Sequence, residues 1–329
     1  MTPKKRWLAF ARGLVAALAV GWVATLVDWP RALSAVKSAN SYLLVGAVFI
    51  SLAGLFVSAV RWKLLLRAVG VSFRLVEAYR AYLSAVFIGL AMPGIIGGDV
   101  ARVWICTRRT KASLGLVTST VFFERWLGLV ALAGLLSVGL WTTHAEDFGA
   151  LGAWACIIMA LGLLAAFLLP TLFVRFLAVS QRAKLLRALW RRIGTERLNR
   201  LSALGAIRIF QVIPAFSLSF LLQFLDIVMT YVLVKALGQT ITLGMLLVAV
   251  PITYLATILP LSPSGLGVRE GTLVFVLSRY GIVASDAALL AFGVFLVRVL
   301  VGFVGFAVQA TSLRAVRGMR TSIELTAGR

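Results

Sequence analysis

The chain has few of the residues that soluble enzymes use for catalysis and metal binding. Its 329 residues include one histidine and two cysteines, and Cys106 and Cys156 do not form a CxxC pair. A metal site of the usual histidine and cysteine type is therefore not expected. The motifs GxSxG, Walker A and HExxH are absent, and His144 lies in an acidic loop. We expect no metal, no cofactor and no catalytic site.

Acidic residues are also scarce, with 11 Asp and Glu against 33 Lys and Arg and a net charge of +22. The basic residues cluster in loops between apolar runs, and no aromatic-rich soluble domain presents them. This distribution is typical of the positive-inside rule, by which Lys and Arg mark cytoplasmic loops. We therefore expect no nucleic-acid partner, and we expect the basic loops to contact anionic lipids of the inner leaflet.

Hydrophobic residues, in contrast, make up 61% of the chain and recur in runs near 20 residues. A run of that length crosses the roughly 30 Å hydrocarbon core of a bilayer. The sequence therefore predicts an all-α polytopic membrane protein, with residues 1–329 forming a single transmembrane domain. The N-terminal run after Lys4, Lys5 and Arg6 is interpreted as an uncleaved first span, because many more spans follow it.

The apolar runs predict about six full spans and two interrupted regions. The full spans are expected at 7–27, 41–66, 116–141, 151–175, 209–237 and 286–312. The regions 76–109 and 243–281 are each broken in the middle by Pro and Gly. Counted by hydropathy alone, each broken region scores as one or two spans, so the total is about eight.

Loop charge orients these spans. Both flanks of region 76–109 are basic, through residues 61–80 and 102–111, so this region is expected to enter from the cytoplasm and return there as a hairpin. The loop 142–150 is acidic and is assigned outside, whereas 175–208 and the C-terminal tail are basic and are assigned inside. These assignments place both termini in the cytoplasm and make the second hairpin enter from the opposite face.

An inverted repeat follows from this order. The first half, 1–142, and the second half, 151–312, each contain two spans, a hairpin and a span, and they start from opposite sides. Such repeats with broken helices are a recurrent transporter architecture. Two thin full crossings in place of each hairpin remain an alternative. The basic stretch 178–205 is expected to form a cytoplasmic amphipathic segment lying on the inner leaflet.

Eight ionisable residues fall at the expected membrane depth, four acidic and four basic: Asp99, Arg102, Glu124, Arg125, Asp226, Arg269, Glu270 and Arg298. Each charge at the bilayer centre costs about 2.5 to 3.5 kcal/mol on insertion scales. Such residues are therefore candidates for a substrate pathway, with structural pairing between helices as the alternative.

Spacing predicts some of their partners. Asp99 and Arg102 are three residues apart on a helix and can pair locally, and Asp226 and Arg298 can pair across helices. The doublets Glu124-Arg125 and Arg269-Glu270 are sequence neighbours whose side chains point about 100° apart. Each doublet must therefore find other partners, and we expect a shared central network.

The hairpin tips predict a site for an anion. Gly97 and Gly98 precede a helix that should begin near Asp99, and Pro263, after Ser262, is expected at the first position of the other half-helix. Two helix N-termini near the midplane, with arginines beside them, suit a phosphate group. Glycines that serve only close helix packing are the alternative.

The set of motifs PGIIGGDVAR (93–102), FFERWLG (122–128) and SPSGLGVREG (262–271) resembles the flippase-like family, the transmembrane region of lysylphosphatidylglycerol synthases and its stand-alone relatives. The resemblance covers essentially the whole chain. It implies an inner-membrane protein that moves a lipid, without lysylation activity, because no aminoacyl-transfer domain follows the last span. The central residues it implies belong to the three motifs: Gly98, Asp99, Arg102, Glu124, Arg125, Gly267, Arg269 and Glu270.

We therefore expect a lipid translocase that binds an anionic or aminoacylated phospholipid, or a polyprenyl phosphate, at a polar midplane site. The site residues expected from the two breaks and the nearby charges include Pro93, Gly97, Pro263 and Gly265 in addition to the motif residues, with Asp226 and Arg298 as secondary members. Three alternatives stay open: a membrane-embedded lipid-modifying enzyme, a non-catalytic subunit of a partner synthase, and a solute transporter. A homo-oligomer is also compatible with the sequence.

Overall fold

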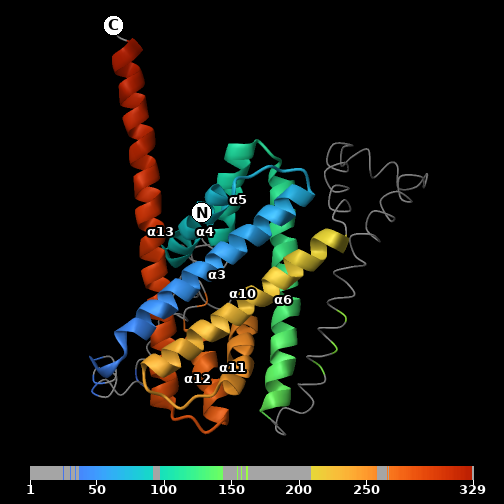
Figure 1. The fold of residues 1–329 in the computed structure, drawn as a ribbon, viewed down its shortest axis with the longest axis vertical. Helices are drawn as coiled ribbons and strands as arrows, with labels where there is room; N and C mark the ends of the chain where they lie inside the picture. The colour runs from blue at the N-terminus through green and yellow to red at the C-terminus, as the bar shows by residue number, and fades with distance from the viewer. Residues whose placement is uncertain are drawn as a thin grey trace, which may run out of the picture.

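The computed structural model describes residues 37–91, 97–143, 209–257 and 267–327, together with positions 25, 30, 34, 154, 157, 161 and 265. The regular structure of these ranges is helical, as predicted (Figure 1). The bounds are α3 Ser41–Ala68, α4 Leu75–Ala91, α5 Gly97–Thr110, α6 Leu114–Thr142, α10 Ile209–Ala236, α11 Leu243–Ala256, α12 Val268–Arg279 and α13 Ala284–Ala327. The predicted spans 7–27 and 151–175 and the segment 178–205 lie outside the described ranges, apart from single positions.

Four of these helices are long and apolar enough to cross a membrane. They are α3, α6, residues Ile213–Ala236 of α10 and residues Ala284–Gln309 of α13. The predicted spans 41–66, 116–141, 209–237 and 286–312 are thereby confirmed to within a few residues. The last helix differs at its end, because α13 continues as one helix of 44 residues and projects beyond the bundle (Figure 1).

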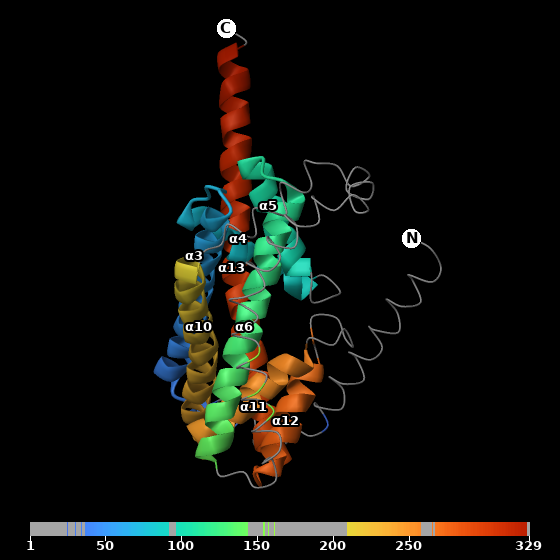
Figure 2. The same ribbon diagram turned by 90° about the vertical axis from the view of Figure 1, so that its right-hand side faces the viewer.

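The two broken regions each form a pair of short helices. In the first, α4 of 17 residues packs against α5 of 14, and in the second, α11 of 14 residues packs against α12 of 12. At 1.5 Å per residue these helices are about 18 to 26 Å long, less than the hydrocarbon core. The two hairpins lie toward opposite ends of the molecule (Figures 1 and 2).

The long helices bring the two hairpins into one bundle. α3 and α10 pack along each other through the centre. Each hairpin also contacts the last long helix of the other half of the chain: α4 packs against α13, and α11 packs against α6 (Figure 2). Segments that are far apart in sequence therefore lie side by side at the middle of the bundle.

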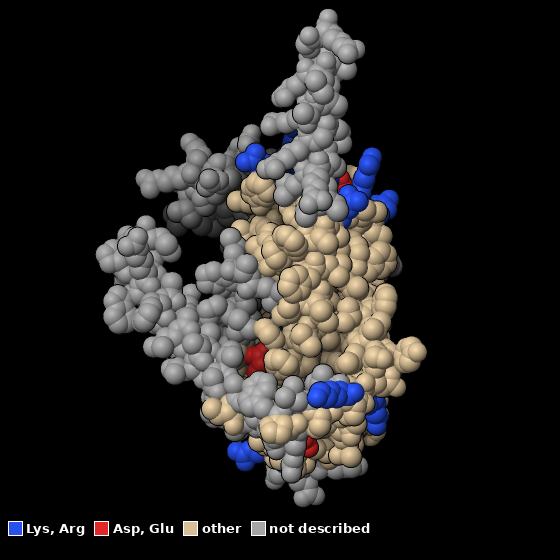
Figure 3. Space-filling view, turned by 90° about the vertical axis from the view of Figure 1, so that its left-hand side faces the viewer, with Lys and Arg blue, Asp and Glu red and all other residues tan. Residues whose placement is uncertain are grey.

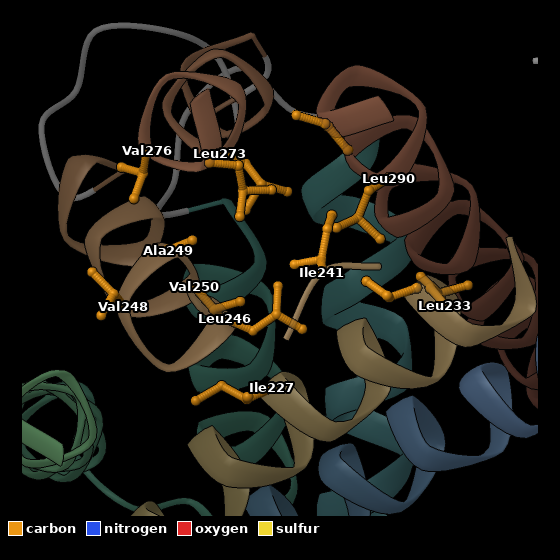
Figure 4. Close-up of a cluster of buried hydrophobic side chains, with 14 of the residues drawn as sticks. Ile227, Leu233, Ile241, Leu246, Val248, Ala249, Val250, Leu273, Val276 and Leu290 are labelled. Carbon is orange, nitrogen blue, oxygen red and sulfur yellow. The ribbon is translucent and has the colours of Figure 1, made fainter. Parts of the chain in front are cut away.

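Two apolar clusters fill the interior. One surrounds Trp62 of α3, whose indole N–H donates to Thr120 Oγ1 of α6 at 3.1 Å. The other joins α10, α11, α12 and α13, and Figure 4 shows Ile227, Leu246 and Leu273 of these helices turned toward one another. Both clusters consist mainly of Leu, Val and Ala, which pack closely in a helix bundle.

The outer surface is apolar as well. Figure 3 shows Lys and Arg gathered toward the two ends of the molecule, with a wide band between them in which neither appears. Exposed side chains such as Phe49, Phe122 and Phe303 project from the long helices. Broad exposed apolar surface is typical of a membrane contact, and we interpret this band as the lipid-facing surface.

Glycines allow close contact where helices of the two halves cross. A Cβ atom at Gly139 of α6 would lie 2.6 Å from the carbonyl carbon of Leu247 on α11. Gly305 of α13 lies in the same way against the backbone of Leu83 on α4. Small residues at crossings let helix backbones approach in the absence of a hydrophobic driving force.

We predict that Gly139→Ala lowers the stability of the protein by about 1 to 3 kcal/mol, because the added methyl group overlaps the backbone of α11. The midpoint of thermal unfolding in detergent, followed by tryptophan fluorescence, measures this effect. Gly46→Ala in α3 is the matched control, since its Cβ meets nothing within 4 Å. Equal midpoints for the two variants would show that the crossing is not tight.

Candidate functional site

The structure places the predicted charged residues in two clusters, one in each half of the chain. Asp99, Arg102, Glu124 and Arg125 form the first, which we call the closed cluster because its charges are engaged with one another. Asp226, Arg269 and Arg298 line a cavity and form the second, the open cluster. The expected single network is therefore divided into two. Pro93 and Pro263 lie outside the described residues.

Glu124 of α6 is the centre of the closed cluster. Arg61 Nη2 donates to its Oε1 at 2.5 Å and Arg102 Nη1 to its Oε2 at 2.7 Å, and the hydroxyl of Tyr82 donates to Oε1 as well. The side chain is almost completely buried. Two cations and a hydroxyl thus hold one carboxylate and join α3, α4, α5 and α6.

Arg102 and Arg61 are themselves held by further contacts. The guanidinium of Arg102 lies over the ring of Tyr82, 4.6 Å from its centroid, and over that of Trp62 at 5.2 Å. Arg61 donates through Nη1 to Ser219 Oγ of α10 at 2.9 Å. Stacking on aromatic faces adds to ion pairing for a desolvated arginine. The closed cluster therefore connects the first hairpin to both central helices.

Asp99 completes this cluster in the first turn of α5, which begins at Gly97, two residues before the predicted start near Asp99. Its Oδ1 lies 2.9 Å from Arg102 Nη2, which confirms the local pair, and its Oδ2 lies 2.7 Å from Arg125 Nη2. Gly98 is required for packing, because a Cβ there would lie 2.6 Å from the carbonyl oxygen of Ala85 on α4. The acidic groups of this cluster are thus engaged with arginines.

The open cluster has a different arrangement. Asp226 of α10 accepts a hydrogen bond from the Tyr254 hydroxyl of α11 at 2.9 Å, and the guanidinium of Arg269 lies 4.6 Å from the centroid of the same tyrosine ring. The expected ion pair between Asp226 and Arg298 does not form, although both line one cavity. Neither Arg269 nor Arg298 forms an ion pair with a carboxylate in the described part of the chain.

The cavity of the open cluster measures about 200 Å³ and lies between the two halves of the chain. One wall comes from α3 and α4, and the other from α10, α11, α12 and α13. Its polar lining consists of two serines of α3 and four polar or charged side chains of the second half: Ser51, Ser58, Asp226, Tyr254, Arg269 and Arg298. The remaining lining is almost wholly apolar: Gly54, Leu55, Val86, Leu222, Met229, Val294, Val297 and Val301. The site thus combines cationic groups with a lipid-like wall.

The second half-helix begins later than predicted. We expected its start at Pro263, whereas α12 begins at Val268 with Gly267 as its N-cap. Gly267 has φ 78°, and its N–H donates to Glu270 Oε2 at 2.6 Å. Gly265 also has a positive φ and packs beside Thr257. The two glycines with positive φ and the hydrogen bond to Glu270 therefore determine where α12 begins. The carboxylate of Glu270 is bound to the backbone and does not line the cavity.

Sequence reasoning missed three functional side chains. Arg61 was counted with the basic loop 61–80, yet it lies inside α3 and is 5% exposed. Its position inside the predicted span 41–66 was the available signal, since a charge within a span needs a partner. Tyr82 and Tyr254 gave no comparable signal, because tyrosine is common in membrane helices.

We predict that Glu124→Gln destabilises the protein by about 3 to 5 kcal/mol, because it leaves two buried guanidinium groups without a carboxylate. The thermal midpoint in detergent measures the loss. Glu77→Gln, which breaks the exposed Glu77–Arg109 pair, is the control and should cost at most about 1 kcal/mol.

A double variant separates charge compensation from packing. Adding Arg61→Met to Glu124→Gln removes one of the stranded charges, so the double variant should be more stable than the sum of the two single changes predicts. Additive losses would show that Arg61 and Glu124 act independently.

Comparison with known proteins agrees with this architecture. A family model described as the lysylphosphatidylglycerol synthase TM region matches residues 9–305. A UPF0104 membrane protein of Methanocaldococcus jannaschii is 26% identical over 201 residues, which are 61% of this chain and 83% of that protein. The family match includes both hairpins, α3, α6 and α10. The chain is a multi-pass membrane protein and belongs to the family of the lysylphosphatidylglycerol synthase transmembrane region.

Proposed function

We propose that the protein is a lipid translocase that binds a phosphate-bearing lipid headgroup in the open cluster and moves it between leaflets. The observation that carries this proposal is the pair Arg269 and Arg298, two guanidinium groups that line one cavity between the halves of the chain and form no ion pair with a carboxylate of the described residues. Both arginines are half-buried at the expected membrane depth, where a charge without a counter-ion is costly, so a ligand of opposite charge is favoured at this place.

The charge of the cavity selects the class of headgroup. Two arginines face one aspartate there, so the lining carries a net charge of +1 (two positive, one negative). An anionic phosphodiester or phosphomonoester neutralises the arginines, and guanidinium groups bind phosphate oxygens in pairs of parallel hydrogen bonds. Asp226 lines the same cavity and would form an ion pair with the ammonium group of an aminoacylated headgroup.

The apolar part of the lining fits the rest of a lipid. Leu55, Val86, Leu222 and Val301 come from four different helices and surround the polar groups. A lipid headgroup that enters this cavity can keep its acyl chains against apolar surface while its phosphate meets the arginines. A small hydrophilic solute would gain nothing from such walls.

The packing of the helices supports an inverted repeat, in which α3, α4, α5 and α6 correspond to α10, α11, α12 and α13. When each helix is replaced by its counterpart, every packed pair of helices gives another pair that is also packed. The pair α4 and α13 gives α11 and α6, the pair α3 and α13 gives α10 and α6, and the pair α5 and α6 gives α12 and α13. α3 with α10 maps onto itself. Transporters with such repeats bind their substrates where the repeats meet.

The hairpins carry a matched pair of side chains that supports the same correspondence. In the first hairpin Arg102 of α5 stacks on Tyr82 of α4, and in the second Arg269 of α12 stacks on Tyr254 of α11. Both guanidinium carbons lie 4.6 Å from the ring centroid, and both tyrosines donate to a carboxylate. We infer that the two hairpins are equivalent elements that enter the membrane from opposite faces of the inner membrane, with both termini in the cytoplasm.

An enzymatic role for Glu124 is less favoured. As the candidate proton acceptor it would need a free lone pair directed at a substrate. Arg61, Arg102 and Tyr82 already donate to it in the closed cluster. These contacts fit a structural counter-ion better than a general base.

We predict that Arg298→Gln and Arg269→Gln each slow lipid movement about tenfold or more, because each removes a charge-assisted contact to phosphate worth about 1.5 to 3 kcal/mol. The assay uses the full chain in phosphatidylglycerol vesicles with a fluorescent phosphatidylglycerol tracer. Dithionite quenches tracer in the outer leaflet, so the slow second phase of quenching reports translocation.

Arg279→Gln is the matched control, since Arg279 lies exposed on the same helix as Arg269 but away from the cavity. This variant should move lipid at the rate of the unmodified protein. If all three variants are equally active, or if vesicles with the unmodified protein move tracer no faster than empty vesicles, the proposal is wrong.

A further inference from the structure

A second, larger cavity lies at the open end of the first hairpin, where α4 begins and α5 ends, and it includes no residue of the closed or the open cluster. It is an open surface cavity of about 670 Å³, bordered by the α3–α4 loop, the start of α4 and the α5–α6 turn. Gly70 in the first connection has φ 79° and Lys111 in the second has φ 56°, so both connections turn sharply at the rim. The same end carries the basic loops that orient the chain.

The polar groups of this cavity are only partly engaged. Arg109 Nη1 donates to Glu77 Oε1 at 2.5 Å, so this carboxylate already has a partner. Arg74 and Ser72 also line the cavity, and Arg74 forms no ion pair with a carboxylate of the described residues. Two arginines and one glutamate line the cavity, so the lining carries a net positive charge, and only one of the two guanidinium groups is paired with a carboxylate of the described residues.

The surroundings place the cavity at the depth of lipid headgroups. Trp104 of α5 is exposed, and the guanidinium of Arg108, one turn further along, lies 5.4 Å from the centroid of its ring. Exposed tryptophans mark the membrane interface, where arginines extend toward the phosphates. Arg109 and Thr110, which line the cavity, follow directly in the chain. The cavity therefore opens where phosphate groups are abundant.

We propose that this cavity is a second phosphate-binding site, in which Arg74 and Arg109 hold a phosphate monoester or diester at the membrane surface. The hydroxyl of Ser72 donates a further hydrogen bond. The ligand is a phospholipid headgroup or a free phosphate ester, since both present the same oxygens to the arginines. This site does not depend on lipid translocation through the open cluster, and it shares no residue with that cluster.

The test is equilibrium binding to the purified full chain in detergent, by calorimetry, with Arg298→Gln as the background so that the central cavity contributes little. Three probes are compared: dihexanoyl phosphatidylglycerol, glycerol 3-phosphate and the phosphate-free dihexanoylglycerol. Arg74→Gln should weaken binding of the phosphate probes about tenfold, the effect of one charge-assisted contact. Arg80→Gln, which changes an exposed arginine of α4 that does not line this cavity, should leave binding unchanged.

The outcomes are distinct. Binding of the lipid probe alone identifies a headgroup site, and equal binding of glycerol 3-phosphate identifies a site for free esters; both support the proposal. Equal loss in Arg74→Gln and Arg80→Gln, equal binding of dihexanoylglycerol, or no binding of either phosphate probe overturns it. Should Arg74→Gln fail to fold, Ser72→Phe serves as the second variant, because it fills the cavity from the exposed loop without changing charge.

Discussion

A charge inside a membrane bundle is costly unless an opposite charge or a suitable hydrogen-bonding group lies within contact distance. The carboxylate of Glu124 meets this requirement for Arg61 and Arg102 at once, with Tyr82 as a third donor. These contacts join helices that are far apart in sequence, and Arg61 extends the link to α10 through Ser219. Since breaking such a group leaves buried charges unpaired, the position of the first hairpin depends on it.

The two halves of the chain differ in how their charged side chains are paired. In the first half the buried carboxylates are engaged by arginines, so little electrostatic energy remains for a ligand. In the second half Arg269 stacks on Tyr254 but has no ion pair with a described carboxylate. The two hairpins thus carry similar Arg–Tyr contacts, but the charge of the arginine is compensated by carboxylates only in the first. A ligand anion is expected at the half that lacks compensation.

Hydropathy and loop charge were sufficient to predict the helical fold, the four long helices and both hairpins, because each depends on segment length and composition alone. They could not predict which charges pair. Arg61 lies 63 residues from Glu124 in sequence, and their contact depends on how α3 and α6 pack. The start of α12 at Val268 was missed for a related reason. Pro263 is a strong local signal for a helix start, whereas the hydrogen bond from the Gly267 N–H to Glu270 forms only in the folded backbone.

The two charged doublets show how backbone geometry decides the chemistry. Glu124 lies within a long helix whose N–H groups are satisfied, so its carboxylate is available to compensate arginines. Glu270 lies in the first turn of α12, where backbone N–H groups lack intrahelical partners, and its carboxylate accepts from Gly267. Glu270 therefore does not act as a counter-ion for Arg269. Because α12 begins at this break, Glu270 binds the backbone, and Arg269 lines the cavity without a carboxylate partner among the described residues.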